Sequence, residues 1–159
     1  MKRDKYLILN TGSTSTKVAV YTVEGEKIYD KTVDHPADQL LKYPTIQSQY
    51  EFRCQQLEET IKESGFSLKE MAAIGARGGA LIPIYEGGTY LVDDYMCQAF
   101  IDSPVQHAAN LGAQIAKHFG DMEGIRAYIV DPDVIDEMTP IARVCGLKNV
   151  ERSAQWHAL

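Results

Sequence analysis

The chain has 159 residues, 45% of them hydrophobic and 24% charged, which is typical of one soluble globular domain. Its 16 basic and 22 acidic side chains give a net charge of −6, which argues against nucleic-acid backbone or anionic lipid as a main partner. The apolar run at residues 6–9 is too short for a signal peptide. No run approaches the roughly 20 apolar residues of a membrane span. We therefore expect neither nucleic acid nor membrane as a partner.

Three cysteines, Cys54, Cys97 and Cys145, are too few and too widely spaced for a disulfide framework or a zinc site. We interpret them as reduced thiols in or near the core. Reduced thiols are typical of a reducing compartment, so the sequence favours a cytoplasmic location.

Three strands are predicted at the start of the chain. Residues 6–9 form a short apolar run, residues 18–23 are mostly apolar, and residues 27–34 alternate in polarity. Polar, turn-rich residues 10–17 join the first two strands, and a short turn at 24–26 joins the second and third. The opening therefore predicts a three-strand meander.

Helices and strands alternate after the meander. Apolar residues spaced four, three and four apart predict a helix ending near Gly65: Tyr50, Cys54, Leu57 and Ile61. Ser67 and Glu70 have the spacing of a capping box on one short extra turn. Residues 71–76 are predicted as a buried strand, and residues 77–88 as an irregular, glycine-rich segment.

The last third of the chain predicts two more helices and a strand. Asp93 is placed to cap a helix that runs through Phe100. Ser103-Pro104 predicts the start of another helix, and Gly120 its end. Residues 127–130 form an apolar strand, and residues 153–159 have the pattern of a further helix that the chain does not complete.

Residues 10–17 (NTGSTSTK) form the most informative motif. The segment is not a phosphate-binding Walker loop, because it lacks GxxxxGK[ST] and leads into a strand instead of a helix. As a hairpin turn it directs amides and hydroxyls to one side, where Gly12 permits close backbone approach and Lys17 adds a charge. Asn10, Ser13 and Ser15 supply further polar contacts to a phosphate or a metal-bound water. The alternative is an ordinary hairpin whose hydroxyls satisfy the turn.

Five segments together carry a resemblance to butyrate kinases and branched-chain fatty-acid kinases, relatives of acetate kinase. In chain order they are LILNTGSTSTKVAVY, GARGGALIPIYEGGTYLVDD, HAANLGAQIA, YIVDPDVIDEMTPIARVCGL and ERSAQWHAL, which cover nearly the whole chain. The resemblance implies an α/β domain of the actin/hexokinase type (ribonuclease H-like), with a three-strand meander followed by parallel strands and flanking helices.

The resemblance also implies an activity. Members of this family reversibly transfer the ATP γ-phosphate to a short-chain carboxylate, with Mg²⁺, and act as homo-oligomers. Butyrate or a branched-chain acid is then the acceptor and the acyl phosphate the product. We expect residues 1–150 to form the N-terminal domain and residues 151–159 to begin a truncated second domain. The missing domain would supply adenosine-binding loops, so the 159-residue chain alone is expected to be inactive.

The resemblance assigns roles to single residues. It places four residues around the transferring phosphate: Asn10, Ser13, Ser15 and Lys17. Arg77 would bind the acyl carboxylate or the phosphoryl group with its fork of donors. Asp131 would orient Mg²⁺ or its waters, or hold an arginine, and His157 would contact the phosphoryl group. The structural alternatives are a surface arginine, an acidic turn and an exposed terminal histidine.

Other interpretations remain open at this point. His107 and Asn110 either line an acyl pocket or decorate a helix N-terminus. The chain as a whole is either part of a carboxylate kinase or a non-catalytic module that binds phosphate or nucleotide. A kinase of the same fold acting on a sugar or polyol would need a general base, which a carboxylate acceptor with a pKa of about 4–5 does not.

Overall fold

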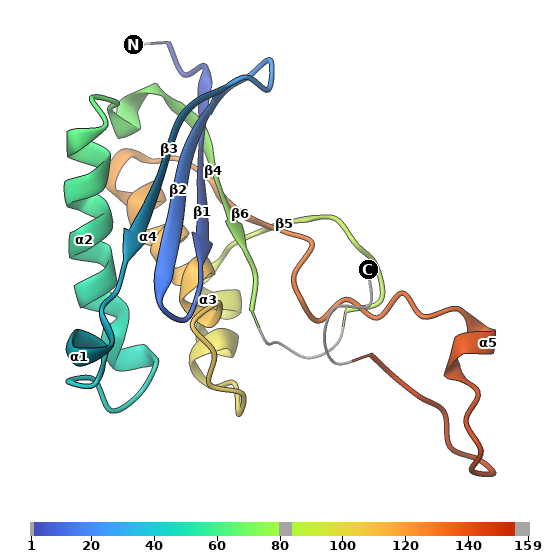
Figure 1. Ribbon diagram of the computed structural model, residues 1–159. Helices are drawn as coiled ribbons and strands as arrows, with labels where there is room; N and C mark the ends of the chain where they lie inside the picture. The colour runs from blue at the N-terminus through green and yellow to red at the C-terminus, as the bar shows by residue number, and fades with distance from the viewer. Residues whose placement is uncertain (1, 80–83, 155–159) are drawn as a thin grey trace.

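The first three strands of the chain form an antiparallel meander (Figure 1). The computed structural model describes residues 2–79 and 84–154. Its first strands are β1 (Lys5–Thr11), β2 (Ser15–Thr22) and β3 (Lys27–Asp34). The predicted meander is confirmed, and the turn between β1 and β2 shrinks to residues 12–14 because both strands extend into the polar segment.

The sheet continues with parallel strands on the other side of β1. β4 (Met71–Arg77) pairs parallel with β1, and β6 (Ala127–Val130) pairs parallel with β4. β5 (Thr89–Leu91) pairs antiparallel with β6 and is the last strand of the open sheet. The strand order is therefore β3-β2-β1-β4-β6-β5. The predicted α/β fold class is confirmed. β5 was not predicted, because three residues are too few for an alternating pattern to show.

Three longer helices contribute to one core against the sheet: α2 (Tyr50–Glu63), α3 (Asp94–Ile101) and α4 (Asn110–Glu123). Figure 1 shows α2 and α4 stacked against the strands, and α3 beside α4. Short helical turns complete the described part: α1 (Ala37–Leu40), η1 (Gln47–Gln49), η2 (Leu68–Glu70) and α5 (Pro140–Arg143). No helix within residues 2–79 and 84–154 is long and apolar enough to cross a membrane.

Three of the predicted capping signals are confirmed. The chain leaves α2 through Gly65, whose φ of 78° favours glycine. Ser67 and Glu70 form the complete capping box around η2. Asp93 caps α3 by accepting a 2.8 Å hydrogen bond from the backbone N–H of Met96. These signals depend on contacts within a few residues, which a sequence contains in full.

The predicted limits of the helix after Ser103 were wrong. The Ser103 hydroxyl accepts a hydrogen bond from the N–H of Val105, which closes a local turn, and α4 begins only at Asn110. At the other end Gly120 lies inside α4, and the helix ends at Gly124, with φ of 63°. Gly120 is needed for close packing instead, because a Cβ there would lie 2.5 Å from the Ile125 carbonyl oxygen.

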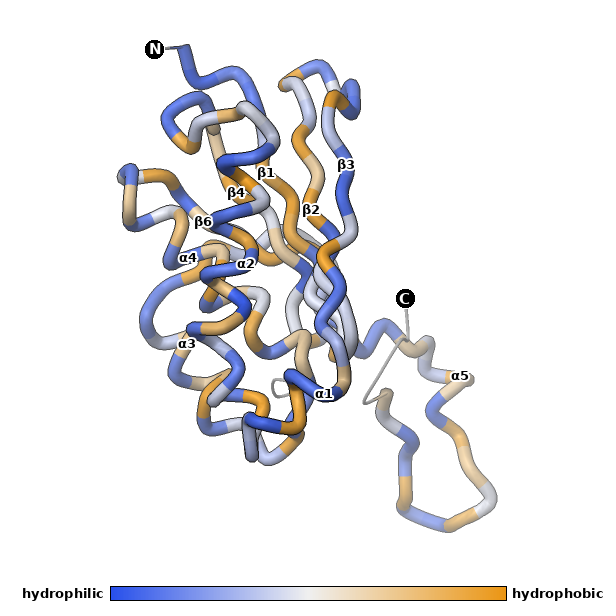
Figure 2. The backbone as a smooth tube through the Cα atoms, turned by 60° about the vertical axis from the view of Figure 1, so that its left-hand side comes forward, coloured by the Kyte–Doolittle hydropathy of each residue, from blue (hydrophilic) through white to orange (hydrophobic). Residues whose placement is uncertain are grey.

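The core lies between the helices and one face of the sheet. In β1, Leu7 and Leu9 are buried, whereas Tyr6 and Ile8 on the opposite face are each 37% exposed. Figure 2 shows hydrophobic colour along much of β1 and β2, whereas β3 is mostly hydrophilic. The helix stripes predicted as core are buried as expected: Cys54, Leu57, Ile61, Ile115, Ala116 and Phe119. Beyond β6, residues 131–154 lead away from the sheet and carry α5 (Figure 1).

Replacing Gly120 by alanine should destabilise the fold. Alanine at an open helix position is about 1 kcal/mol better than glycine. At Gly120 the added methyl group overlaps the Ile125 carbonyl. We expect a net loss of about 1–3 kcal/mol in the free energy of unfolding, measured by urea titration. Gly146→Ala is the matched control, because a Cβ at Gly146 meets nothing within 4 Å. Equal stability of the two variants would contradict the packing role of Gly120.

Candidate functional site

The carboxyl ends of the three parallel strands, β1, β4 and β6, lie side by side at one end of the sheet, called the carboxyl edge below. Leu9 of β1 is in register with Ala76 of β4, and Arg77 is in register with Val130 of β6. The turn at 12–14, the side chain of Arg77 and Asp131 therefore follow neighbouring strands at the same edge. In α/β sheets the carboxyl edge is where ligands bind.

The turn between β1 and β2 directs its carbonyl groups into the protein. Arg53 of α2 donates to the carbonyl oxygens of Gly12, at 2.8 Å, and Ser13, at 2.9 Å. The backbone N–H of His35 donates to the carbonyl oxygen of Thr14 at 2.7 Å. The Ser15 carbonyl accepts from the N–H of Gly12 at 2.8 Å, which closes the hairpin. Four successive carbonyl groups thus have partners within the protein.

The amides of the same turn are available to a ligand. Within the described part of the chain, the backbone N–H groups of Ser13 and Thr14 have no hydrogen-bond partner, and both residues are exposed. Successive outward N–H groups in a turn form an anion-binding concavity. The hairpin is therefore polarised, with carbonyl groups inside and amides outside, which is the arrangement that a phosphate requires.

Three predicted phosphate ligands flank the turn on one face of the sheet. Asn10 and Lys17 are directly opposite each other in the β1–β2 ladder, and both are exposed. Ser15, two residues before Lys17, is on the same face because side chains alternate along a strand. Thr11 and Thr16 occupy the opposite face and are buried. Asn10, Ser15 and Lys17 thus add polar groups and one charge on one face of the sheet next to the turn.

Arg77 is held by a residue that the sequence analysis missed. Its Nε donates to Oδ1 of Asp133 at 2.7 Å, and the two side chains form an ion pair. The Arg77 side chain is 45% exposed, whereas that of Asp133 is only 7% exposed. Asp133 therefore fixes the direction of a guanidinium group that remains accessible. The signal for it in the sequence is the repeated acid in Asp131-Pro132-Asp133, directly after a predicted strand.

Asp131 tethers a glycine loop. Its Oδ1 accepts a 2.7 Å hydrogen bond from the N–H of Gly88, and Oε1 of Glu137 accepts one from Gly87. Asp131 has a φ of 42°, in the left-handed region that few residues other than glycine adopt. One role considered for Asp131 was to hold an arginine. In the structure, Asp133 holds Arg77 instead. Within residues 2–79 and 84–154, no group of three or more His, Cys, Asp or Glu side chains is arranged to hold a metal ion.

The start of α4 packs against the same edge of the sheet. A Cβ at Gly112 would lie 2.6 Å from the Arg77 carbonyl oxygen, and a Cβ at Gly79 would lie 2.3 Å from Oδ1 of Asn110. Asn110 is buried and donates from Nδ2 to the Val105 carbonyl oxygen at 2.8 Å. His107 accepts from the N–H of Ala109. Both side chains thus stabilise the turn that leads into α4.

His157, which was predicted to contact the phosphoryl group, lies outside the described residues.

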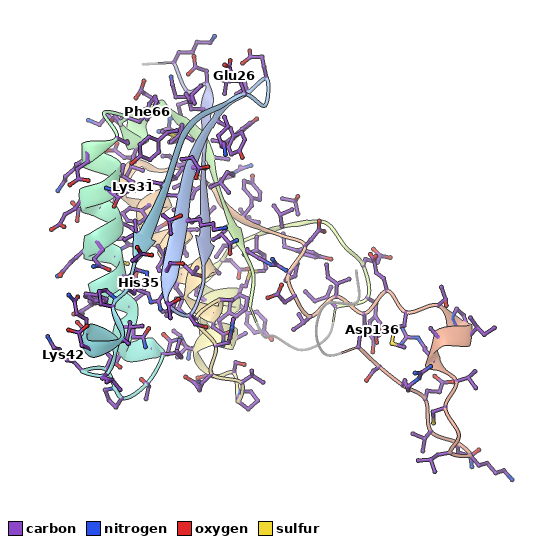
Figure 3. The ribbon with its side chains drawn as sticks, viewed as in Figure 1. Glu26, Lys31, His35, Lys42, Phe66 and Asp136 are labelled. Carbon is purple, nitrogen blue, oxygen red and sulfur yellow. The ribbon has the colours of Figure 1, made fainter. Side chains whose placement is uncertain are left out.

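A buried histidine supports the turn from below. His35 lies between the end of β3 and α2 (Figure 3), where its Nδ1 is 2.6 Å from Oε1 of Gln56. An amide oxygen only accepts, so Nδ1 carries the proton and Nε2 accepts from the Thr16 hydroxyl at 2.8 Å. Burial, and then the nearby charge of Arg53, lower the pKa of His35. The ring is therefore neutral at pH 7.

The chain matches kinases of short-chain carboxylic acids in two comparisons. It is 42% identical to a probable butyrate kinase of Clostridium botulinum (strain Eklund 17B / Type B), over 98% of this chain and 43% of that protein. It is also 42% identical to a probable butyrate kinase 1 of Thermotoga maritima, with the same coverage. No protein-family model matches the chain. The resemblance read from the sequence is thereby confirmed, and the chain spans less than half the length of these curated relatives.

Solved structures confirm the fold. The acetate kinase of Porphyromonas gingivalis superposes with a TM-score of 0.58 and 14% identity, over 91% of this chain and 41% of that chain. The acetate kinase of Entamoeba histolytica gives a TM-score of 0.53 and 15% identity, over 91% and 39%. The chain has the actin/hexokinase-type fold, and it resembles the N-terminal part of the butyrate kinases.

His35 should make the stability of the fold depend on pH. Its pKa in the folded protein is below the ordinary value of 6.5, so the unfolded chain binds more protons as the pH falls through that value. The wild type should therefore lose stability below about pH 6.5, and His35→Gln should lose less. Urea unfolding at about pH 7.5 and pH 5.5 measures the difference. The same loss in both proteins would show that His35 does not titrate as inferred.

Proposed function

We propose that this chain is the phosphate-handling part of an ATP-dependent kinase of short-chain fatty acids, with butyrate or a branched-chain acid as acceptor. The observation that carries the proposal is the polarised turn at 12–14, whose outward amides suit a phosphate group. The names of the curated relatives agree with this chemistry. Reversible transfer would produce ADP and an acyl phosphate.

Each residue around the turn would have its own role in binding the phosphate. The amides of Ser13 and Thr14 would donate to the transferring phosphoryl group, and the Lys17 ammonium would balance its charge. Asn10 and Ser15 would donate from either side. Because little covalent chemistry is required of the protein in phosphoryl transfer, rigid placement of these donors supplies most of the catalysis.

Arg77 is the candidate ligand for the acyl carboxylate. Asp133 holds one side of its guanidinium group, which leaves further donors of the fork to an approaching carboxylate. The carboxylate is ionised at neutral pH, since such acids have pKa values of about 4–5, and no residue has to remove a proton from it. This absence of a proton-transfer step separates the proposal from a sugar or polyol kinase.

A Mg²⁺ ion fits the chemistry of this edge. Magnesium keeps several waters and binds one or two carboxylates together with substrate phosphates, so it does not need a cluster of protein ligands. Asp131 is the candidate carboxylate, because it directly follows β6 at the same end of the sheet as the turn. When bound, Mg²⁺ would neutralise charge on the phosphates. His157 is proposed to contact the phosphoryl group.

The remaining parts of the proposal concern the whole protein. Residues 1–150 would be the N-terminal domain, residues 151–159 would begin a second domain carrying the adenosine site, and the complete enzyme would be a cytoplasmic homo-oligomer. The alternative is a stand-alone module that binds phosphate or nucleotide without turnover. The alternative follows from the same turn, because anion binding needs only that element.

A hydroxylamine trap distinguishes these functions, since only an acyl phosphate gives a hydroxamate. The natural protein that carries this chain, its length established from its intact mass, is incubated with ATP, Mg²⁺, butyrate and hydroxylamine. We expect hydroxamate with butyrate and none with glycerol or glucose. ATP binding without hydroxamate would favour the stand-alone module, and ADP release with a polyol would favour a polyol kinase.

Lys17→Met should weaken binding of ATP about tenfold or more, because a charge-assisted hydrogen bond to phosphate contributes about 1.5–3 kcal/mol. Isothermal titration of the natural protein measures the affinity. The midpoint of thermal unfolding should hardly change, since Lys17 is exposed and forms no ion pair within the described part of the chain. Lys42→Met is the control: Lys42 is an exposed lysine beside α1 (Figure 3). Equal weakening in both variants would mean that only net charge matters.

A further inference from the structure

Arg53 is a buried arginine that has no acidic partner among the described residues. Its side chain on α2 is 0% exposed. It makes four hydrogen bonds, two to the carbonyl oxygens of Gly12 and Ser13 and two to Oε1 of Gln49. Within residues 2–79 and 84–154 no carboxylate lies within ion-pair distance of it.

This arrangement is energetically unusual. A buried charge is costly unless it is paired, and arginine is almost never fully buried without a partner. Burial lowers the pKa of Arg53 to about 10, which leaves the guanidinium group charged at neutral pH. All of its hydrogen-bond acceptors are neutral oxygens, so the positive charge remains uncompensated within the described part of the chain.

The charge lies directly beneath the proposed phosphate-binding turn. Arg53 Nη1 and Nη2 bind two successive carbonyl oxygens of that turn, at 2.8 and 2.9 Å. A peptide group whose carbonyl points to Arg53 points its N–H away from Arg53. The peptide groups concerned join Gly12 to Ser13 and Ser13 to Thr14, and their N–H groups are the two outward amides.

We propose that Arg53 is a positioning residue of the phosphate-binding turn, and that a phosphate bound on the outer side balances its buried charge. The guanidinium group holds the two peptide groups in the orientation that presents their amides, and its charge adds to the attraction for an anion through the turn. This inference rests on the proposed function and names the residue that sets the geometry of its site.

The fork of arginine is required for this task. Two nitrogens of one planar group reach two neighbouring carbonyl oxygens, while Nε and Nη2 are held by Gln49, one turn earlier at the start of α2. A lysine has one nitrogen on a flexible stem, and it would keep the charge but lose the simultaneous contact with both peptide groups. The two properties, charge and orientation, can therefore be separated by substitution.

The experiment compares the natural protein with Arg53→Met, which removes both properties, and Arg53→Lys, which keeps the charge. Titration with inorganic phosphate and with ATP is followed by the ¹⁵N–¹H signals of Ser13 and Thr14, and by calorimetry. We expect Arg53→Met to weaken both affinities at least tenfold and Arg53→Lys to recover part of the loss. In the free protein, the ¹⁵N–¹H signals of Ser13 and Thr14 should shift in both variants, because the two peptide groups lose their common anchor.

Cys54→Ala is the matched control. Cys54 is the next residue on α2, is buried, and contributes to the hydrophobic core. It should lower the midpoint of thermal unfolding without changing either affinity. If Arg53→Met does not fold, Arg53→Lys is compared with Cys54→Ala, and a loss of affinity in the lysine variant alone supports the proposal.

The outcomes separate the two claims. If the wild type binds phosphate and ATP, and both Arg53 variants bind them equally well, the positioning role is overturned and the proposed function stands. If the wild type binds neither through Ser13 and Thr14, the proposed function is overturned and the inference falls with it.

Discussion

The orientation of two peptide groups in the β1–β2 turn is the constraint on which the site depends. A hairpin of this length has no intrinsic reason to direct all its carbonyl groups inward. Here a buried guanidinium group and the backbone of His35 bind three of them from below. The protein must bury a positive charge to obtain this polarity, a cost that an anion on the outer side would offset. The outward direction of the amides of the turn thus originates in α2 and in the chain just after β3.

The sheet order adds the rest of the site. Because β1, β4 and β6 run parallel, three separate stretches of the chain end at one end of the sheet, where Thr11, Arg77 and Asp131 lie at or just after the strand ends. Glycines at positions 79 and 112 let the first turn of α4 lie against the end of β4, where any side chain would overlap backbone or Asn110. Arg77 is then directed by Asp133, which follows the neighbouring strand. Backbone packing therefore sets the spacing of the strand ends, and the side-chain pair of Arg77 and Asp133 sets the direction of the guanidinium group.

Much of the local structure was predictable, for reasons visible in particular residues. Asp93, Gly65 and the Ser67–Glu70 pair act over a few residues, so their effects are complete in the sequence. Ser103 and Gly120 carry the same kinds of signal, yet the helix start and end predicted from them were wrong. Ser103 closes a local turn, and the helix begins only at Asn110. Gly120 lies inside the helix, where it allows the backbone of Ile125 to pack closely against it. A glycine that ends a helix and one that permits packing look the same until the neighbouring segment is known.

The sequence by itself determined the meander, the buried helix stripes and the polar character of residues 10–17, because these depend on periodicity and on residue type. It also carried the resemblance to butyrate kinases, which depends on residue order alone. Only the tertiary structure decided which groups of the turn face outward, that Asp133 and not Asp131 holds Arg77, and that Arg53 lies beneath the turn. These three facts involve residues about 40 to 56 positions apart in the chain. Contacts at such separation follow from strand order and helix packing, which no local pattern contains.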